Sequence, residues 1–161
     1  MKPMPTILAR TLVAAAIAFA AAGAGAQTYT KQQLQETYSS YLAQEGYRPE
    51  LTNAGNVKFR REGKIYVVYV DERDPTFFRL QLLFSPDDKS AAMRAKRVEG
   101  ANLATGETKV IKSYIDSDGD IVFAAEMFLV VPGDFKTTLA RLFRAMDSAY
   151  EKYQAKVQAL N

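Results

Sequence analysis

Residues 63–84, GKIYVVYVDERDPTFFRLQLLF, carry apolar side chains on both sides of an extended chain. Successive side chains of a strand point to opposite faces of a sheet, so a strand with one buried face alternates apolar and polar residues. In the predicted strand over residues 65–70, one side holds Ile65, Val67 and Tyr69. The other side holds Tyr66, Val68 and Val70. Both faces of the sheet therefore need a cover, which limits the folds open to the chain.

Residues 1–26 have the pattern of a signal peptide. A basic start with Lys2 and Arg10 precedes the apolar run TLVAAAIAFAAA, and Ala24 and Ala26 occupy the positions that signal peptidase recognises. We predict cleavage after Ala26, which leaves residues 27–161 as one domain of 161 − 26 = 135 residues. The apolar run is shorter than the roughly 20 residues of a membrane span. We therefore expect an exported product, periplasmic or secreted, with no membrane attachment after cleavage.

Charge and composition argue against several function classes. The formal net charge of +3 falls to 3 − 2 = +1 without Lys2 and Arg10, so the mature chain lacks the basic excess of a nucleic-acid-binding protein. The chain has no cysteine and no histidine, which removes Cys–His and Ser–His–Asp catalysis and the commonest zinc sites. We predict no catalytic residue, no metal site and no cofactor.

The periodicity of apolar residues predicts an α+β domain. The expected order is a helix beginning at Thr30, a three-stranded antiparallel meander, a helix over residues 85–102 beginning at Ser85, a two-stranded hairpin, and a helix beginning at Asp134. The turn sequences EG and DG give short hairpin links. The strands should therefore form a single, largely antiparallel sheet with flanking helices.

The turns also predict which residues lie opposite each other. We expect Phe59 opposite Tyr66, Val70 opposite Thr76, and Tyr114 opposite Phe123. With these registers, a second apolar face surrounds Arg79, Gln81 and Glu126. Its eight apolar members are Ile65, Val67, Tyr69, Phe77, Ile111, Ile115, Val122 and Phe128.

This second face should not stay bare. Burial of a large apolar side chain is worth roughly 1.5–3 kcal/mol, so eight exposed ones would forfeit more than about 10 kcal/mol. That figure is comparable with the stability of a whole domain. Three covers are open: the helix over residues 85–102, a second copy of the chain, or a captured polypeptide or apolar ligand.

Glu126 interrupts an otherwise apolar strand of this face. An unpaired buried charge is costly, so we expect Arg79, on the same side of the third strand, to form an ion pair with Glu126. The predicted partner-binding residues are Tyr69, Phe77, Arg79, Gln81, Glu126 and Phe128.

Two acidic motifs have both a structural and a functional interpretation. The sequence DSDGD spaces Asp116, Asp118 and Asp120 like the first ligands of a calcium loop, but a hairpin turn explains the same residues. The loop DERDP places Asp71 beside other carboxylates, which could support acid–base catalysis or form a solvated link between strands.

The stretch LQETYSSYLAQEGYRPELTNAGNVKFRREGKIYVVYVDERDPTFFRLQLLF resembles the YbjN domain family, as do GANLATGETKVIKSYI and DIVFAAEMFL in the same order. The resemblance covers about residues 30–158. It implies the fold of type III secretion chaperones, no enzymatic activity, frequent dimerisation, and a role in protein binding or bacterial regulation.

We therefore expect a non-enzymatic, exported protein-binding or regulatory module. It would bind a protein or peptide partner, and itself as a homodimer, through the second sheet face, without binding nucleic acid. Two alternatives stay open. One is a carboxylate-dependent periplasmic hydrolase that uses the Asp71 loop or Glu126, and the other is a purely structural periplasmic protein whose second face is closed by its own helix.

Overall fold

A six-stranded antiparallel sheet organises residues 28–160, which are the residues that the computed structural model describes. The elements are α1 (Lys31–Gln44), β1 (Glu50–Leu51), β2 (Val57–Arg61), β3 (Lys64–Val68), β4 (Phe77–Phe84), α2 (Ala91–Glu107), β5 (Ile111–Ile115), β6 (Ile121–Phe128), the 3₁₀ turn η1 (Pro132–Asp134) and α3 (Phe135–Ala159). The strands lie in the order β1-β2-β3-β4-β6-β5. The predicted α+β class is confirmed, whereas the predicted signal peptide, residues 1–26, lies outside the described residues.

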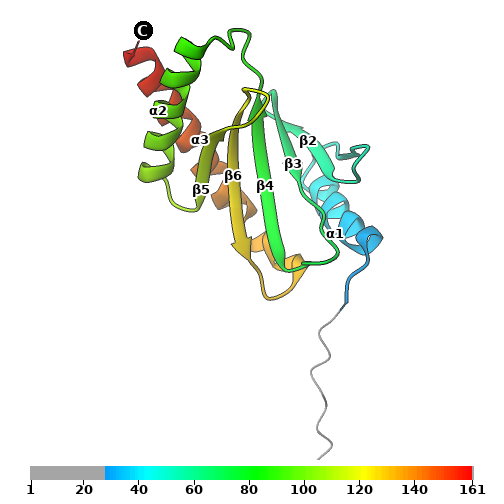
Figure 1. The fold of residues 1–161 in the computed structure, drawn as a ribbon. Helices are drawn as coiled ribbons and strands as arrows, with labels where there is room; N and C mark the ends of the chain where they lie inside the picture. Colours follow the sequence, from blue (N-terminus) through cyan, green and yellow to red (C-terminus); the bar gives the residue numbers. More distant parts are fainter. Residues whose placement is uncertain (1–27, 161) are drawn as a thin grey trace, which may run out of the picture.

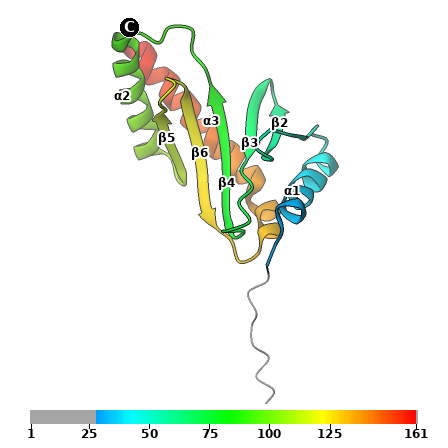
Figure 2. The same cartoon turned by 45° about the vertical axis from the view of Figure 1, so that its right-hand side comes forward.

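The core lies on one face of the sheet, here called the inner face, beneath α1 and α3. Figures 1 and 2 show α3 running behind β4 and β6, with α1 behind the other end of the sheet. The largest fully buried side chains come from both layers: Tyr38, Phe59, Tyr66, Phe78, Phe123, Phe135 and Met146. These two helices and one sheet face form most of a single core, to which α2 adds Ala101 and Ala104.

Local signals place α1 as predicted. The Thr30 hydroxyl accepts a hydrogen bond from the backbone N–H of Gln33, and the Gln33 side chain accepts one from the Thr30 N–H. This reciprocal capping box satisfies two of the backbone donors that a helix start leaves free. Gly46, with φ of +88°, ends the helix in the left-handed conformation that glycine adopts without strain.

The meander keeps the predicted faces. Phe59 pairs with Tyr66 as expected. Val68 pairs with Leu80, so the prediction that Val70 lies opposite Thr76 is wrong by two residues. Because side chains alternate with a period of two, this shift leaves every residue on its predicted face. The link before β2 also contributes the short strand β1, which the periodicity did not predict.

The second hairpin differs from its predicted register by one residue. Tyr114 pairs with Val122 rather than with Phe123. The loop has three residues rather than two, since the Asp116 carboxylate accepts hydrogen bonds from the N–H groups of both Asp118 and Asp120. A slip of one residue moves a whole strand to the other face. The prediction for β5 is therefore wrong: Ile111 and Ile115 face the core, while Lys112 and Tyr114 lie on the other side.

Helix α2 begins five residues after the predicted start. Ser90 is its N-cap, with its hydroxyl accepting from the Met93 N–H at 3.3 Å. The predicted cap, Ser85, instead donates its hydroxyl to the Asp120 carboxylate at 2.8 Å. Both serines suit a cap, and this tertiary contact accounts for the choice between them.

Helix α2 lies beside the sheet rather than over its second face. Figures 1 and 2 show it next to β5 and the end of α3. A Cβ on Gly100 would come within 3.2 Å of the Tyr153 carbonyl oxygen, so the two helices approach closely there. The Thr105 hydroxyl bonds both the N–H of Ser113, at 2.8 Å, and its carbonyl, at 3.2 Å. Helix α2 therefore closes the β5 edge, and of the three covers considered for the second face, the helix is excluded.

Candidate functional site

No helix formed by residues 28–160 lies over the face of the sheet opposite the core, here called the outer face. Figure 1 is viewed onto this face, with β4 and β6 in front. The register assigns it Ile65, Val67, Phe77, Arg79, Gln81, Leu83, Lys112, Tyr114, Val122, Ala124, Glu126 and Phe128. Tyr69 extends this set beyond β3, where its N–H donates to the Arg79 carbonyl at 3.0 Å. The outer face therefore has to be covered by its own side chains or by a partner.

Glu126 lies between two cations on this face. Arg79 Nε lies 2.9 Å from one carboxylate oxygen, which confirms the predicted ion pair, and Lys112 Nζ lies 2.8 Å from the other. Lys112 was missed because the predicted register placed it on the core side. Although Arg79 Nε and Glu126 Oε1 are close, they are not aligned for a hydrogen bond, and both atoms are buried without a hydrogen-bond partner. Because these two atoms are shielded from solvent, a partner can reach only other parts of the pair, whose side chains are 35% and 22% exposed.

Two aromatic rings lie close to the Arg79 guanidinium group. Its guanidinium carbon lies 5.3 Å from the ring centre of Tyr69 and 5.7 Å from that of Phe77. Each such contact is worth about 0.5–1 kcal/mol at an exposed site. The Phe77 ring in turn packs against Phe128 at 5.4 Å between centroids. Burial raises the pKa of Tyr69, so its hydroxyl stays protonated at neutral pH.

The centre of the outer face is already covered. Gln81 is only 4% exposed, and its side-chain amide donates to the Tyr114 hydroxyl at 3.2 Å. Val122 and Ala124 are buried beside it. Gln81 was predicted to contact a partner, but the structure places it beneath its neighbours. The predicted partner-binding residues that stay at least partly accessible are here called the outer patch: Tyr69, Phe77, Arg79, Glu126 and Phe128.

One end of the outer patch is strongly exposed. Phe128 is 78% exposed, and Val130, just beyond the end of β6, is 87% exposed. A hollow of about 230 Å³ opens beside the patch, lined by Tyr69, Phe77, Arg79 and the loop after β3. Val130 was missed because the prediction followed strand faces only. Its signal was the apolar run FLVV before a proline.

The Asp71 loop is a charged link. The Asp71 carboxylate accepts from both the backbone N–H and the side chain of Arg73, at 3.0 and 3.2 Å. These hydrogen bonds hold the pKa of Asp71 below its usual value. A general acid needs a raised pKa, so this geometry gives the hydrolase alternative no support.

The DSDGD motif is a hairpin turn, as one of its two interpretations predicted. Gly119 has φ of +83°, and the Asp116 carboxylate bonds backbone N–H groups within the loop. Hydrogen bonds from Lys89 and Ser85 lower the pKa of Asp120. Within residues 28–160, no three potential metal ligands are grouped closely enough to hold an ion.

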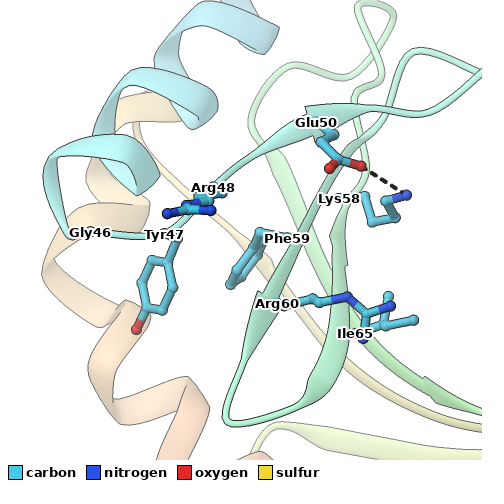
Figure 3. A pocket seen from close by; sticks show the side chains of 8 residues that line it. All are labelled: Gly46, Tyr47, Arg48, Glu50, Lys58, Phe59, Arg60 and Ile65. Atoms are coloured by element: carbon cyan, nitrogen blue, oxygen red, sulfur yellow. Dashed lines mark ion pairs between the residues drawn. The ribbon is translucent and has the colours of Figure 1, made fainter.

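A larger hollow, of about 470 Å³, lies at the opposite edge of the sheet from β5. The chain leading from α1 into β1 borders it on one side and β2 on the other, as Figure 3 shows. Arg48 and Arg60 are among the residues that line it. The residues between α1 and β2 were predicted to be an irregular link, so no pattern pointed to this hollow.

Comparisons with known proteins inform the fold. No family model matches the chain, and no curated protein matches it. Among solved structures, the chain is similar to an uncharacterized protein from Methanothermobacter thermautotrophicus, with a TM-score of 0.53 and 13% identity, over 77% of this chain and 99% of that one. At this identity the likeness concerns the fold alone, and membership of the YbjN family stays a prediction.

Proposed function

We propose that the protein is a non-enzymatic binding module whose outer patch docks an acidic, partly apolar surface of another protein. The observation that carries this proposal is the exposed Phe128 packed against Phe77, beside Arg79, whose side chain is 35% exposed. Exposed aromatic anchors next to arginine are the residue types that dominate the binding energy of protein interfaces.

Charge supports an acidic partner. On β4, β5 and β6 the outer-face positions carry two cations, Arg79 and Lys112, against one anion, Glu126. The difference is 2 − 1 = +1. A partner with acidic side chains complements this charge, whereas a second copy of the chain would bring like charges together. We therefore assign the outer patch to a different protein and treat a homodimer as the competing outcome.

We further propose that docking takes place outside the cytoplasm, because residues 1–26 have the pattern of a signal peptide. Mass spectrometry of the protein recovered from the periplasm or the medium tests this directly. The expected mature chain begins at Gln27, and an intact start at Met1 would contradict export with cleavage. Within residues 28–160, no helix is both long and apolar enough to span a membrane.

Site-specific photo-cross-linking in producing cells tests the docking proposal. A photoreactive amino acid is placed at Phe128 and, as a matched control, at Arg144, an exposed position on α3. We expect a discrete cross-linked protein from position 128 and none from position 144. That protein is then purified, and its binding to the wild type should be lost in Phe77→Asp.

Three results would contradict the proposal. They are cross-links of equal yield from both positions, no cross-link from position 128, or a product with the mass of two copies of this chain. The last result would assign the patch to self-association. Light scattering checks independently for self-association. We expect the mass of a monomer for both the mature wild type and Phe77→Asp.

A further inference from the structure

The β2 edge is open over half of its length. Strand β1 is two residues long and pairs only with Val57 and Lys58, whereas β2 continues to Arg61. Pro49 precedes β1 and has no N–H to donate, which ends the pairing at Glu50. The segment from Phe59 to Arg61 therefore has a strand on one side only.

Strand pairing shows which backbone groups face the open side. Glu62 and Gly63 both have positive φ, +50° and +76°, as a two-residue type I′ turn requires. The flanking pair Arg61↔Lys64 is then hydrogen-bonded across β2 and β3, and bonding alternates along an antiparallel ladder. The N–H and C=O of Arg60 consequently point away from β3, toward the side of β2 where β1 no longer pairs.

The larger hollow lies beside this open edge. In Figure 3, Tyr47 and Phe59 stand side by side, and their ring centroids are 5.2 Å apart. The figure also shows the Arg60 side chain extending toward Ile65 on the outer face. Phe59 is buried in the core, so the accessible lining beside the free backbone groups of β2 is the half-buried Tyr47 and Ile65 together with the exposed Arg48 and Arg60.

The cations of this hollow are only partly neutralised. Lys58 is paired with Glu50 at 3.1 Å. Arg48 and Arg60 are exposed, and no residue in the described part of the chain forms an ion pair or a hydrogen bond with either side chain. Two guanidinium groups are therefore available to a ligand, and guanidinium binds carboxylates with two parallel hydrogen bonds.

We propose that the β2 edge binds an extended segment of another polypeptide as an added strand, and that this segment alternates acidic and apolar side chains. The Arg60 backbone would supply strand hydrogen bonds, Arg48 and Arg60 would bind the acidic side chains, and the half-buried side chains of Tyr47 and Ile65 would face the apolar ones. This site is separate from the outer patch, and the inference does not require the patch to dock a partner.

The opposite sheet edge supports this assignment by contrast. There the Thr105 hydroxyl bonds the N–H and carbonyl of Ser113, so α2 occupies the β5 edge. Proteins block exposed strand edges because such edges pair with other chains. This chain closes one edge with a helix and leaves the Arg60 edge free beside a cationic hollow.

Fluorescence anisotropy with labelled peptides tests the proposal on the mature chain. The probe is the alternating hexapeptide Glu-Val-Glu-Val-Glu-Val. One control is the block peptide Glu-Glu-Glu-Val-Val-Val, with equal composition and charge, and a second replaces each glutamate with lysine. We expect the alternating acidic peptide to bind at least about tenfold more tightly than either control, because only it matches both the side-chain period and the charge.

Variants then separate the side chain from the backbone. Arg48→Ala and Arg60→Ala should each weaken binding by about tenfold, whereas Arg141→Ala, at another exposed arginine remote from this edge, should not change it. Arg60→Pro removes an N–H that faces away from β3, so the domain should stay folded and bind more weakly than Arg60→Ala. Phe77→Asp should leave peptide binding unchanged, even though it abolishes docking at the outer patch.

Equal binding of the alternating and block peptides would overturn strand addition. So would wild-type affinity in Arg60→Ala, or an equal loss in Arg141→Ala. If Arg60→Pro unfolds, as circular dichroism would show, the peptide pair and the alanine variants still decide the result.

Discussion

Each face of the sheet carries one carboxylate held between two cations. On the inner side, Asp147 of α3 binds Arg61 at 2.9 Å and Lys64 at 2.8 Å. On the outer side, Glu126 lies at the same short distances from Arg79 and Lys112. The inner cluster joins α3 to the hairpin of β2 and β3. The outer cluster joins only strands of the sheet, namely β4, β5 and β6.

The two clusters differ in how fully they are satisfied. Both contacts of Asp147 are aligned hydrogen bonds, and its side chain is 23% exposed. Burial acts to raise the pKa of Asp147, but the hydrogen bonds from Lys64 and Arg61 outweigh it, and the pKa is lowered. In the outer cluster, Arg79 Nε and Glu126 Oε1 lack such bonds. The two carboxylate side chains are almost equally exposed, at 23% and 22%, and Glu126 accepts one aligned hydrogen bond, from Lys112. We infer that the inner cluster stabilises the fold more than the outer one does.

The sharpest test of this contrast uses two neighbouring phenylalanines. Phe78 is fully buried against Tyr38 and Phe135, while Phe77 lies on the outer face. Phe78→Ala should lower the free energy of unfolding by about 3–5 kcal/mol, because it leaves a cavity in the core. Phe77→Ala should cost less than about 1 kcal/mol. Urea unfolding measures both, and similar losses would remove the distinction between the faces.

The inner ion cluster should be the next most sensitive feature. Asp147→Asn should cost about 2 kcal/mol at pH 7, the scale of hydrogen bonds to a charged group. Glu126→Gln, the matched change on the outer face, should cost less than about 1 kcal/mol. Urea unfolding of both variants against the wild type gives the two losses, and a larger loss in Glu126→Gln would reverse our assignment.

The lowered pKa of Asp147 predicts that the stability of the fold depends on pH. The folded-state pKa of Asp147 is lowered, so its contribution is present above the unfolded pKa of about 4 and is lost as the pH falls below it. The difference in unfolding free energy between the wild type and Asp147→Asn should therefore shrink as the pH falls from about 5 to about 3. An unchanged difference at pH 3 would mean that the carboxylate charge does not stabilise the fold.

A smaller loss is expected where α2 closes the β5 edge. Thr105→Val keeps the shape of the side chain but removes both hydrogen bonds to Ser113, which should cost about 1 kcal/mol. Thr105→Ser retains the hydroxyl and serves as the control. Light scattering should also show more self-association for the valine variant, because the edge is opened. Equal behaviour of the two variants would show that α2 needs no such bond to stay beside β5.

The smallest effect on stability should come from the most exposed aromatic residue. Phe128→Ser should leave the unfolding free energy within about 0.5 kcal/mol of the wild type, because the ring is largely in solvent. It should nevertheless weaken binding of the purified cross-linked partner. A clear loss of stability would instead identify Phe128 as part of the fold.

Local patterns predicted much of this fold. The capping box at Thr30, the pairing of Phe59 with Tyr66 and the Arg79–Glu126 pair all follow from short-range spacing or strand parity. The faces of β5 did not follow from such patterns, because the loop between β5 and β6 has one extra residue. Hydrogen bonds to the Asp116 side chain accommodate that residue. No apolar periodicity records that kind of side-chain-to-backbone bond.

The candidate site was predictable only in part. Strand parity placed Phe77 and Phe128 together, but the burial of Gln81 depends on Tyr114, which the wrong register assigned to the core. The hollow at the β2 edge depends on the turn of the chain around Pro49, which brings Arg48 toward β2. Long-range contacts of this kind leave no periodic trace in a sequence.

The layer of long side chains over the middle of the outer face has a kinetic consequence. Gln81 and Val122 are 4% and 2% exposed without any partner, so a partner does not have to cover the middle of the outer face. A partner at the outer patch gains contact area mainly around Phe77 and Phe128, and small interfaces belong to encounters that form and separate readily. We expect complexes of short lifetime, in which one copy of the domain serves many partner molecules in turn.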